Sequence, residues 1–351
     1  MRVMVAMSGG VDSSVAAALL ARSGHEVVGA TLKLWGGESD SGCCSVADVE
    51  DARRVAGQLG IAHHVFDFTD AFENSVVRPY VDAHADGLTP NPCIECNRHV
   101  KFGRLLDRVR RLGFGALATG HHARVRREGG SERLQLVRGA DPEKDQSYVL
   151  SMLTRDELEM LLLPVGEMRK SEVRALASEL GLRTAAKPDS QDVCFIDSGA
   201  GRKGFLEARG ELHPGTLIDN VSGAVVGSVP ALELITVGQR RGLGVDRGRR
   251  RYALRVDPVA RSVVVGDADA ARAIRVEVRD STWVDTASPP GGRMLAQTSA
   301  HGPVFPCTFE CTVEGGSVVF DSPQRLVAPG QTVALYDLSD PDVVLGGAIA
   351  A

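Results

Sequence analysis

The sequence predicts an α/β domain built on a parallel sheet, followed by two small β-rich domains. In residues 1–200, short apolar runs alternate with helical patterns, which is typical of a parallel sheet with helices on both faces. From about residue 205 onward, short β-branched runs lie between glycine turns instead, as at residues 262–266. We therefore expect domains at residues 1–200, 205–270 and 272–351, a division that suits a chain of 351 residues.

The α/β domain is expected to hold strands at residues 2–7, 26–35, 62–68 and 116–119. A helix that ends at Gly24 follows the first strand, and a helix that Ser45 caps and Gly60 ends follows the second. A further helix leads into a loop with two prolines at residues 88–92, and another helix at residues 103–112 precedes the fourth strand. Strands and helices thus alternate.

The next elements are helical, and the last are strands. Thr154 and Glu157 form a capping box that opens a helix, which Pro164 is expected to end. Residues 171–180 form a further helix with Gly181 as its cap. Beyond residue 272 the pattern is almost purely β, with glycine-containing turns at residues 291–292, 315–316 and 329–330.

The composition describes a globular chain without a membrane span. Hydrophobic residues make up 43%, the formal net charge is −5, and no run of about twenty apolar residues occurs. The apolar run at residues 3–7 is too short for a signal peptide, so we expect a cytoplasmic protein. Seven cysteines, an odd number, argue against a disulfide scaffold and for buried or reactive thiols.

An arginine-rich stretch stands out against the negative net charge. Only one acid, Asp246, accompanies the arginines at positions 240, 241, 247, 249, 250 and 251. Two interpretations are open: a solvated hairpin, or a basic patch that binds nucleic-acid phosphates.

The first candidate site is the loop after the first strand, Ser8-Gly9-Gly10-Val11-Asp12-Ser13. Ligands of open parallel sheets bind at the carboxyl ends of strands, where this loop lies. Glycines let the backbone approach a ligand, and the free amides of a helix N-terminus attract anionic oxygens. Ser8 and Ser13 add hydroxyl donors, and Asp12 suits a magnesium ion carried by a nucleotide. No G-x-x-x-x-G-K-[ST] motif occurs, so the loop is not of the kinase type. The alternative is a glycine turn that only starts a helix.

Two further segments carry cysteines in polar surroundings. Residues 89–98 place Cys93 and Cys96 in a proline-rich loop just before a helix, where the helix dipole lowers the pKa of a thiol and makes it reactive. Residues 189–195 place Cys194 in another polar run. Each of these thiols is either reactive or an inert core residue. The remaining cysteines are expected to be structural or incidental: Cys43, Cys44, Cys307 and Cys311.

Six motifs occur in an arrangement that resembles the bacterial tRNA-specific 2-thiouridylases, a family of ATP pyrophosphatases. They are SGGVDSS at residues 8–14, TPNPCxxCN at 89–97, TGHHAR at 119–124, KDQSYVL at 144–150, SQDVCF at 190–195 and GQRRGLG at 238–244. The resemblance spans nearly the whole chain, and its specificity is high because other ATP pyrophosphatases share only the first motif. It implies an ATP-pyrophosphatase domain, a small central domain and a C-terminal β-barrel.

The resemblance also implies an ATP-dependent tRNA sulfurtransferase. ATP with Mg²⁺ would activate the 2-carbonyl of the wobble uridine (position 34) as an adenylate, and 2-thiouridine, AMP and pyrophosphate would form. Cys194 matches the family's persulfide cysteine, and Cys96 matches the cysteine that attacks the persulfide or releases sulfide from it, so that a transient Cys96–Cys194 disulfide remains. The implied partners are tRNAs for glutamate, glutamine and lysine, and a cysteine desulfurase or sulfur-carrier protein.

Other site residues are carried over from the same motifs. The implied ATP pocket consists of Ala6, Met7, Ser8, Gly9, Gly10, Val11, Asp12, Ser13, Leu32 and Gly120. The implied contacts with the target base and the tRNA are Asn91, Pro92 and Cys93, together with Lys144, Asp145 and Gln146. The family's Arg-Tyr pair aligns with Ser299 and Ala300, which cannot supply the same charge or stacking. Arg250 and Arg251 are therefore expected to bear more of the tRNA binding.

Three alternatives remain open at the level of the sequence. Some family members carry Asp where this chain has Cys93, so Cys93, Cys96 and Cys194 could ligate an iron–sulfur cluster. Zinc lacks a clear fourth ligand, since His99 is a poor candidate. An amide-forming ATP pyrophosphatase would need a glutaminase partner and no thiol chemistry. A non-catalytic RNA-binding or metal-cluster scaffold would tolerate loss of the loop at residues 8–13.

Overall fold

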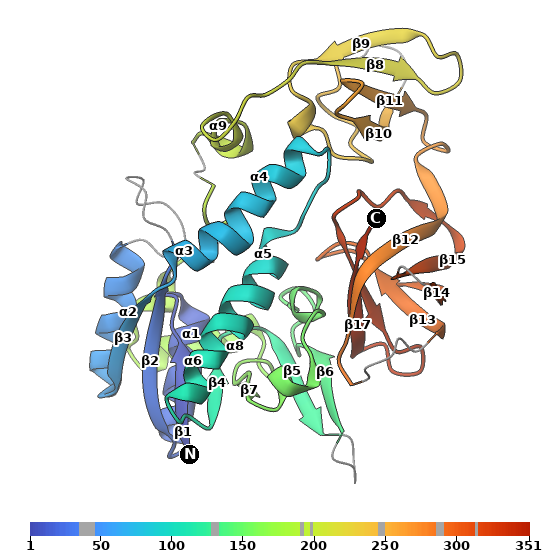
Figure 1. The fold of residues 1–351 in the computed structure, drawn as a ribbon. Coiled ribbons are helices and arrows are strands. Elements are labelled where there is room, and N and C mark those ends of the chain that lie inside the picture. The colour runs from blue at the N-terminus through green and yellow to red at the C-terminus, as the bar shows by residue number, and fades with distance from the viewer. Residues whose placement is uncertain are drawn as a thin grey trace.

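The computed structural model describes residues 1–34, 46–127, 133–189, 193–196, 199–244, 250–285, 291–312 and 315–351. Three sheets organise this part of the chain (Figure 1). A parallel sheet comes first, a four-stranded sheet is central, and an antiparallel barrel ends the chain, so the predicted fold class is confirmed. Cys43, Cys44, Arg247 and Arg249 lie outside the described residues.

The first sheet is parallel throughout, in the order β3, β2, β1, β4 and β7. Its strands are β1 (Arg2–Ala6), β2 (Glu26–Lys33), β3 (Ala62–Asp67), β4 (Ala116–Ala118) and β7 (Leu161–Leu162). The first four correspond to the expected strands. The last replaces part of an expected helix: the capping box of Thr154 and Glu157 forms, but α7 (Arg155–Leu158) already ends before β7 begins.

Helices cover both faces of this sheet, because the side chains of a strand point alternately to its two faces. Val3 and Val5 of β1 pack with helices on one face, and Met4 packs with helices on the other. The first face carries α1 (Val11–Arg22), α2 (Val46–Leu59) and α8 (Lys170–Glu179). The buried strands therefore read as continuous apolar runs, as their sequence indicated.

Two long helical segments cover the second face (Figure 1). They run through α3 (Thr69–Phe72), η1 (Glu73–Val77) and α4 (Arg78–Ala85), and through α5 (Pro92–Glu95), η2 (Cys96–Leu105) and α6 (Leu106–Arg111). The second segment begins eleven residues before the helix expected at 103–112. Asn91 explains the earlier start, since its side chain accepts hydrogen bonds from the Cys93 and Ile94 amides at 3.1 and 3.4 Å.

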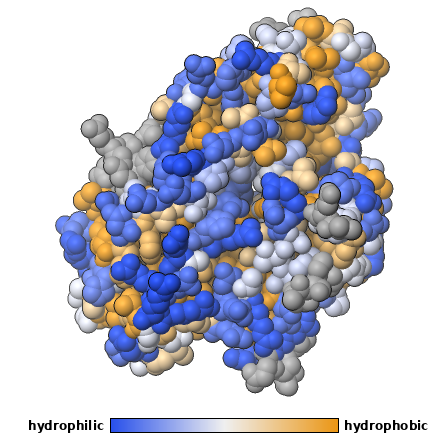
Figure 2. All heavy atoms as spheres, viewed as in Figure 1, coloured by the Kyte–Doolittle hydropathy of each residue, from blue (hydrophilic) through white to orange (hydrophobic). Residues whose placement is uncertain are grey.

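The central domain is a small sheet in the order β10, β11, β8 and β9. Its strands are β8 (Gly215–Asp219), β9 (Val225–Val229), β10 (Tyr252–Asp257) and β11 (Ser262–Gly266). Leu217, Val229 and Val263 are buried in its core. Figure 2 shows hydrophobic residues gathered around this domain, where Val221 and Val225 are exposed.

The C-terminal strands close into a barrel because β12 pairs with both β15 and β17. The barrel strands are β12 (Arg272–Trp283), β13 (Gly292–Gln297), β14 (Phe305–Thr312), β15 (Gly315–Arg325), β16 (Thr332–Tyr336) and β17 (Val343–Ala350). A hairpin from the first part of the chain, β5 (Ala123–Arg127) and β6 (Leu134–Arg138), extends this sheet beyond β17. The barrel is thereby joined to the α/β domain by backbone hydrogen bonds.

Short helical elements complete the described chain: η3 (Tyr148–Leu150), η4 (Arg183–Ala186), α9 (Gly201–Glu207) and η5 (Leu232–Leu234). None of the helices in the described ranges combines the length and apolar character that crossing a bilayer requires.

Candidate nucleotide and sulfur-transfer site

The loop between β1 and α1 has the compact geometry of an anion-binding turn. Gly9 has a φ of +73°, which glycine adopts without strain. The Ser13 hydroxyl accepts a hydrogen bond from the Ser8 amide at 3.2 Å and donates to the Gly10 carbonyl at 3.2 Å. Ser14 donates to the same carbonyl at 2.8 Å. The hydroxyls thus hold the turn that ends at Val11, where the free amides of α1 begin.

Two glycines let neighbouring segments pack directly on this loop. A Cβ on Gly9 would lie 2.3 Å from the Asp48 carbonyl oxygen of α2, and a Cβ on Gly120 would lie 2.5 Å from the Ser13 amide nitrogen. Gly120 follows β4, so the carboxyl ends of β1 and β4 meet at the loop. Leu32 lies near the end of β2 and is buried, and Thr31 beside it donates to the Met7 carbonyl at 2.7 Å.

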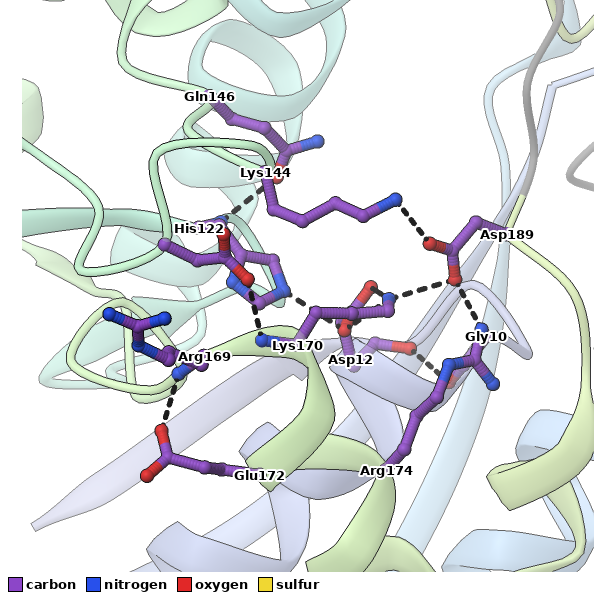
Figure 3. Close-up of polar contacts among 12 residues, drawn as sticks. Gly10, Asp12, His122, Lys144, Gln146, Arg169, Lys170, Glu172, Arg174 and Asp189 are labelled. Atoms are coloured by element: carbon purple, nitrogen blue, oxygen red, sulfur yellow. Dashed lines mark hydrogen bonds and ion pairs between the residues drawn. The ribbon is translucent and has the colours of Figure 1, made fainter.

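A chain of charged side chains extends from the loop (Figure 3). The Lys170 ammonium donates to Oδ1 and Oδ2 of Asp12 at 2.7 and 2.6 Å and lies 2.9 Å from Oδ1 of Asp189. Lys144 donates to Oδ2 of Asp189 at 2.9 Å, and Arg174 donates to Oδ1 at 2.6 Å. His122 lies 3.1 Å from Asp12 Oδ1. Residues from distant parts of the sequence are thus joined in one ionic network.

The network keeps both of its carboxylates ionised. Burial opposes ionisation of Asp12, but hydrogen bonds from His122 and Lys170 outweigh it and lower the pKa of the carboxyl group below its ordinary value. Burial likewise opposes ionisation of Asp189, and hydrogen bonds from Lys170 and Lys144 nevertheless lower its pKa to about 2. At neutral pH the network therefore holds two negative and several positive groups.

The turn at residues 144–146 lies beside this network. Lys144 is partly exposed and bonded to Asp189, and Gln146 accepts a hydrogen bond from the His122 amide at 2.9 Å. Asp145 has an internal role, because its carboxylate accepts bonds from the Gly139 amide, from Ser147 and from Arg138. Its side chain is 6% exposed, so the predicted direct contact of Asp145 with tRNA receives no support from its position.

The cysteine segment begins a helix rather than preceding one. Pro92 is the first residue of α5, Cys93 follows in the first turn and is exposed, and Cys96 lies one turn further and is buried. The expectation that Cys96 stands just before a helix is therefore wrong, because Asn91 caps the helix at an earlier residue. The amides of Cys93 and Ile94 in the first turn donate to the Asn91 side chain.

Cys96 and Cys194 belong to the same hydrophobic cluster. Cys96 is buried within it, and Cys194, half-buried, packs against it. Phe195 anchors the second segment, since its ring lies 5.7 Å from Phe72 and 5.4 Å from Tyr80. Burial raises the pKa of the Tyr80 hydroxyl, Arg202 opposes this rise, and nearby Cys93 adds to it. The segments that carry Cys93 and Cys194 therefore both approach Tyr80.

No group of three or more His, Cys, Asp or Glu side chains within the described ranges is arranged to hold a metal ion. Cys93, Cys96 and Cys194 are all in those ranges and are present as thiols. They do not form the ligand set that the iron–sulfur alternative needs. Cys307 is buried in the barrel, which raises its pKa to about 12, as expected of a structural thiol.

The predicted tRNA contacts outside the α/β domain have different surroundings. Arg250 is exposed, whereas Arg251 forms an ion pair of 2.5 Å with Asp219 of β8 and is largely buried. Ser299 and Ala300 form a turn whose carbonyls accept hydrogen bonds from Gln297 at 2.8 and 3.1 Å. Arg251 is thus engaged within the central domain, and the carbonyls of the turn at residues 299–300 are bonded to Gln297, while Ser299 is exposed.

Sequence reasoning missed the residues that connect the two candidate sites: His122, Lys170, Arg174 and Asp189. Asp189 adjoins the Cys194 motif, and His122 lies in the TGHHAR motif, so both stood within segments already singled out. Lys170 and Arg174 lie on α8, for which the sequence predicted only a helix at residues 171–180. Only the folded chain brings Lys170 to Asp12, 158 residues earlier.

A parallel sheet whose first strand leads through an SGGVDS loop into a helix, with acidic and basic groups around that loop, defines an ATP pyrophosphatase-type nucleotide-binding protein. The family models agree with this class. The tRNA methyl transferase HUP domain matches residues 1–198, the tRNA methyl transferase PRC-barrel domain residues 203–267, and the aminomethyltransferase beta-barrel domain residues 274–350.

Curated relatives define the family more closely. The tRNA-specific 2-thiouridylase MnmA of Roseiflexus castenholzii is 44% identical over 367 residues, which cover 99% of this chain and 98% of the relative. The proteins of the same name from Chloroflexus aurantiacus and Saccharopolyspora erythraea are 44% and 43% identical, with coverage of at least 98% on both sides. The chain belongs to the tRNA-specific 2-thiouridylase family, and the predicted resemblance is confirmed.

Solved structures resemble a smaller part of this chain. NMN synthetase from Francisella tularensis is 19% identical, with a TM-score of 0.34 over 54% of this chain and 66% of that one.

Proposed function

We propose that this tRNA-uridine 2-sulfurtransferase joins its ATP loop and its two thiols, Cys96 and Cys194, in one reaction. Membership of the 2-thiouridylase family gives the overall reaction, the conversion of a tRNA uridine into 2-thiouridine. The observation that carries the rest is the placement of both thiols in one hydrophobic cluster beside the nucleotide-binding sheet.

The first step is activation of the uridine. Displacing a carbonyl oxygen is difficult because oxide is a poor leaving group. Attack of the 2-carbonyl oxygen on the α-phosphorus of ATP releases pyrophosphate and leaves an adenylate, from which AMP departs readily. The loop amides, with Ser8 and Ser13, would bind the phosphates. Mg²⁺ prefers oxygen ligands, which Asp12 and the phosphates would provide, and it would neutralise charge on the pyrophosphate.

The second step transfers sulfur. The terminal sulfur of a Cys194 persulfide attacks C2 of the adenylated uridine, and AMP leaves with the electron pair of the C2–O bond. The Cys96 thiolate then attacks Sγ of Cys194, which breaks the S–S bond and leaves both electrons on the 2-thiouridine sulfur. A Cys96–Cys194 disulfide results, and an external dithiol reductant restores both thiols. The two cysteines thus supply the two electrons that reduce the terminal sulfur of the persulfide.

The remaining groups would bind the RNA. The exposed Cys93 with Asn91 and Pro92 would face the base, and Lys144 and Gln146 would contact the neighbouring backbone. Exposed arginines of the central domain, Arg240, Arg241 and Arg250, would contribute phosphate contacts. The substrates would be tRNAs for glutamate, glutamine and lysine in the cytoplasm, and a cysteine desulfurase or a carrier would supply the sulfur.

Substitution of the two thiols tests the relay. We expect Cys96→Ser and Cys194→Ser each to reduce 2-thiouridine formation to background, while ATP binding stays within about twofold, because neither thiol contributes to the loop. Nucleoside mass analysis of tRNA incubated with ATP, Mg²⁺ and a persulfide source measures the product. Cys311→Ser, on barrel strand β14, is the matched control and should retain full activity.

Near-normal thiolation by either site variant would contradict the relay. The same purified variants also distinguish this function from the amide-forming ligase and the iron–sulfur enzyme. An amide-forming ligase would consume ammonia and ignore both substitutions. A cluster enzyme purified without oxygen would contain iron in proportion to protein and lose it in the Cys93→Ser variant.

A further inference from the structure

We propose that Cys93 and Cys96 form a redox modification site, in which oxidation joins the two thiols in a disulfide and interrupts sulfur transfer. The inference goes beyond the proposed function and rests on it only in taking Cys96 as the thiol that attacks the persulfide. Both residues lie on one continuous helical segment, which runs through α5, η2 and α6. Both are present as thiols, and Cys93 is exposed whereas Cys96 is only 7% exposed.

The helix brings the two cysteines within reach of each other. Residues three apart in a helix have Cα atoms about 5 Å apart, and a disulfide spans about 4.4–6.8 Å between Cα atoms. The Cβ atoms of such a pair are about 5–6 Å apart, so closing to the roughly 3.5–4.5 Å of a disulfide needs a small shift. The first turn, which contains Cys93, can make this shift because helix ends fray.

Cys93 occupies the open end of a buried helix face. Residues at i, i+3, i+4 and i+7 share one side of a helix, so Cys93 lies on the same side as Cys96, Asn97 and Val100. These three residues are at most 7% exposed, whereas Cys93 reaches the surface. A small oxidant in water therefore meets Cys93 first, and the next thiol along that side of the helix is Cys96.

Hydrogen peroxide is the oxidant that this arrangement fits. The Cys93 thiolate, which the helix dipole favours in a first turn, attacks one oxygen of the peroxide. The O–O bond breaks, and hydroxide leaves with its electron pair and is protonated to water. The Cys96 thiolate then attacks the sulfur of the Cys93 sulfenic acid, and the second oxygen leaves as water. The two thiols have thus given two electrons to the peroxide, and an external dithiol restores both thiols by exchange.

The disulfide stops the reaction at a defined step. With its sulfur bonded to Cys93, Cys96 has no thiolate with which to attack the Cys194 persulfide. ATP binding continues, because both thiols lie outside the phosphate loop. The disulfide also limits damage, since capture by a second thiol prevents further oxidation of the sulfenic acid to the irreversible sulfinic acid. The modification is therefore a reversible block of sulfur transfer.

The barrel contains a cysteine pair that serves as an internal control. On strand β14, Cys311 is exposed and Cys307 is buried. Four residues of strand separate their Cα atoms by about 13 Å, which is too far for a disulfide. An exposed thiol and a buried thiol near it in sequence occur in both pairs, but of the two pairs the helical one can close.

Peptide mapping without reduction tests the site. The full-length protein is treated with a small excess of hydrogen peroxide, quenched with catalase, alkylated in denaturant and digested. We expect the peptide that carries Cys93 and Cys96 to lose two hydrogens and both thiols to resist alkylation. Single-turnover formation of 2-thiouridine, measured without added reductant, should fall to background, and prior treatment with dithiothreitol should restore it. Cys307 and Cys311 should not become linked.

Variants at position 93 separate the disulfide from general damage. Cys93→Asp, with the residue that some family members carry there, and Cys93→Ser should each leave Cys96 open to alkylation after the same treatment. Thiolation after treatment is divided by thiolation before it, because the substitutions themselves can alter turnover. This ratio should stay near one in both variants. It should fall to background in the wild type and in the matched control, Cys311→Ser.

The proposal is overturned if the wild-type Cys93 and Cys96 remain open to alkylation at a dose that oxidises Cys311. It is also overturned if Cys96 is lost equally in the wild type and in both position-93 variants, or is linked to Cys194 instead. The mapping requires no turnover. The relay therefore fails separately, if Cys96→Ser still thiolates tRNA.

Discussion

Gly120 has no Cβ, and its absence allows the chain after β4 to pack directly against the nucleotide loop. The residue follows β4, and its Cα faces the backbone of Asp12 and Ser13 so closely that a Cβ would lie 2.5 Å from the Ser13 nitrogen. The obstacle is backbone at the start of α1, which cannot rotate away as a flexible side chain could. Gly120 therefore sets the distance between β4 and the phosphate loop.

Gly120→Ala should displace the loop and weaken ATP binding about ten- to a hundredfold, because overpacking of this kind costs about 1–3 kcal/mol. Equilibrium binding of a fluorescent ATP analogue measures the effect. Gly57→Ala, in the last turn of α2, is the matched control: its Cβ would meet nothing within 4 Å, and it should leave binding unchanged while stabilising the helix slightly. Equal affinities of wild type and Gly120→Ala would show that the loop tolerates the shift.

At the scale of single residues, the sequence singled out the candidate nucleotide loop but not the charged side chains that contact it. Ser8, Gly9 and Ser13 lie within six residues of each other, so the pattern of the candidate phosphate loop is visible in the sequence. Lys170 carries no such pattern, since a lysine at the start of a helix is common on protein surfaces. Its ion pairs depend on the packing of α8 beside α1, which brings two acids from distant segments to one ammonium.

The helix that carries the cysteines illustrates the element scale. An N-cap at Asn91 and a proline in the first turn start it at Pro92, although the sequence pattern favoured a start near residue 103. The π-helical stretch η2 then runs from Cys96 to Leu105. Such stretches are often found at functional sites because they reorient side chains within a helix.

The Thr154 capping box was predictable because its signal is local. The length of α7 was not predictable, because pairing of β7 with β4 ends the helix.

Helix α4 contains a buried histidine at its contact with the central domain. His84 is 2% exposed and packs edge-on against Tyr80, with ring centroids 4.5 Å apart. Burial lowers its pKa to about 4, nearby Arg202 adds to the decrease, and the backbone and carboxylate of Glu233 oppose it. The imidazole is therefore neutral in the folded protein at mildly acidic pH, where the unfolded chain would protonate it.

This difference predicts a loss of stability on acidification. Between about pH 6.5 and pH 4 the unfolded state binds the extra proton, so the free energy of unfolding falls as the pH decreases, by up to about 3 kcal/mol in total. His84→Gln should remove this part of the pH dependence. Thermal unfolding midpoints at pH 7.5 and pH 5 measure it, with His64→Gln, at an exposed position of β3, as the control. If His84→Gln and wild type lose the same amount between the two pH values, His84 is not the responsible group.

On the scale of the whole molecule, the barrel contacts the α/β domain near the turn at residues 144–146 and near the loop that precedes Asn91. Arg138 of β6 bonds to Asp145 and to Gln297 of β13, each at 2.8 Å, and stacks on Tyr336 at 4.1 Å. Near the cysteine helix, the Thr89 amide donates to the Pro329 carbonyl at 2.7 Å. The barrel therefore supports both the turn at residues 144–146 and the loop that leads to Asn91.

The three-part architecture could be predicted from the sequence. Strands alternate with helices first and with glycine turns later, and both patterns depend on residues that are close together in the chain. The pairing of the β5–β6 hairpin with the barrel could not be predicted in this way. Its connection to the barrel rests on two register pairs, Val343 with Val137 and Val344 with Leu136, some two hundred residues apart. Likewise, the sequence named Cys96 and Cys194 through their motifs, but their common hydrophobic cluster is a property of the folded chain.

The central claim is that Cys96 and Cys194 jointly reduce the sulfur that enters the tRNA. A single turnover tests it directly: protein loaded with persulfide is mixed with tRNA, ATP and Mg²⁺ in the absence of any reductant, and its peptides are mapped without reduction. The account predicts a Cys96–Cys194 disulfide in an amount equal to the 2-thiouridine formed, and none when ATP is omitted. Accumulation of 2-thiouridine while both cysteines can still be alkylated as thiols would contradict it.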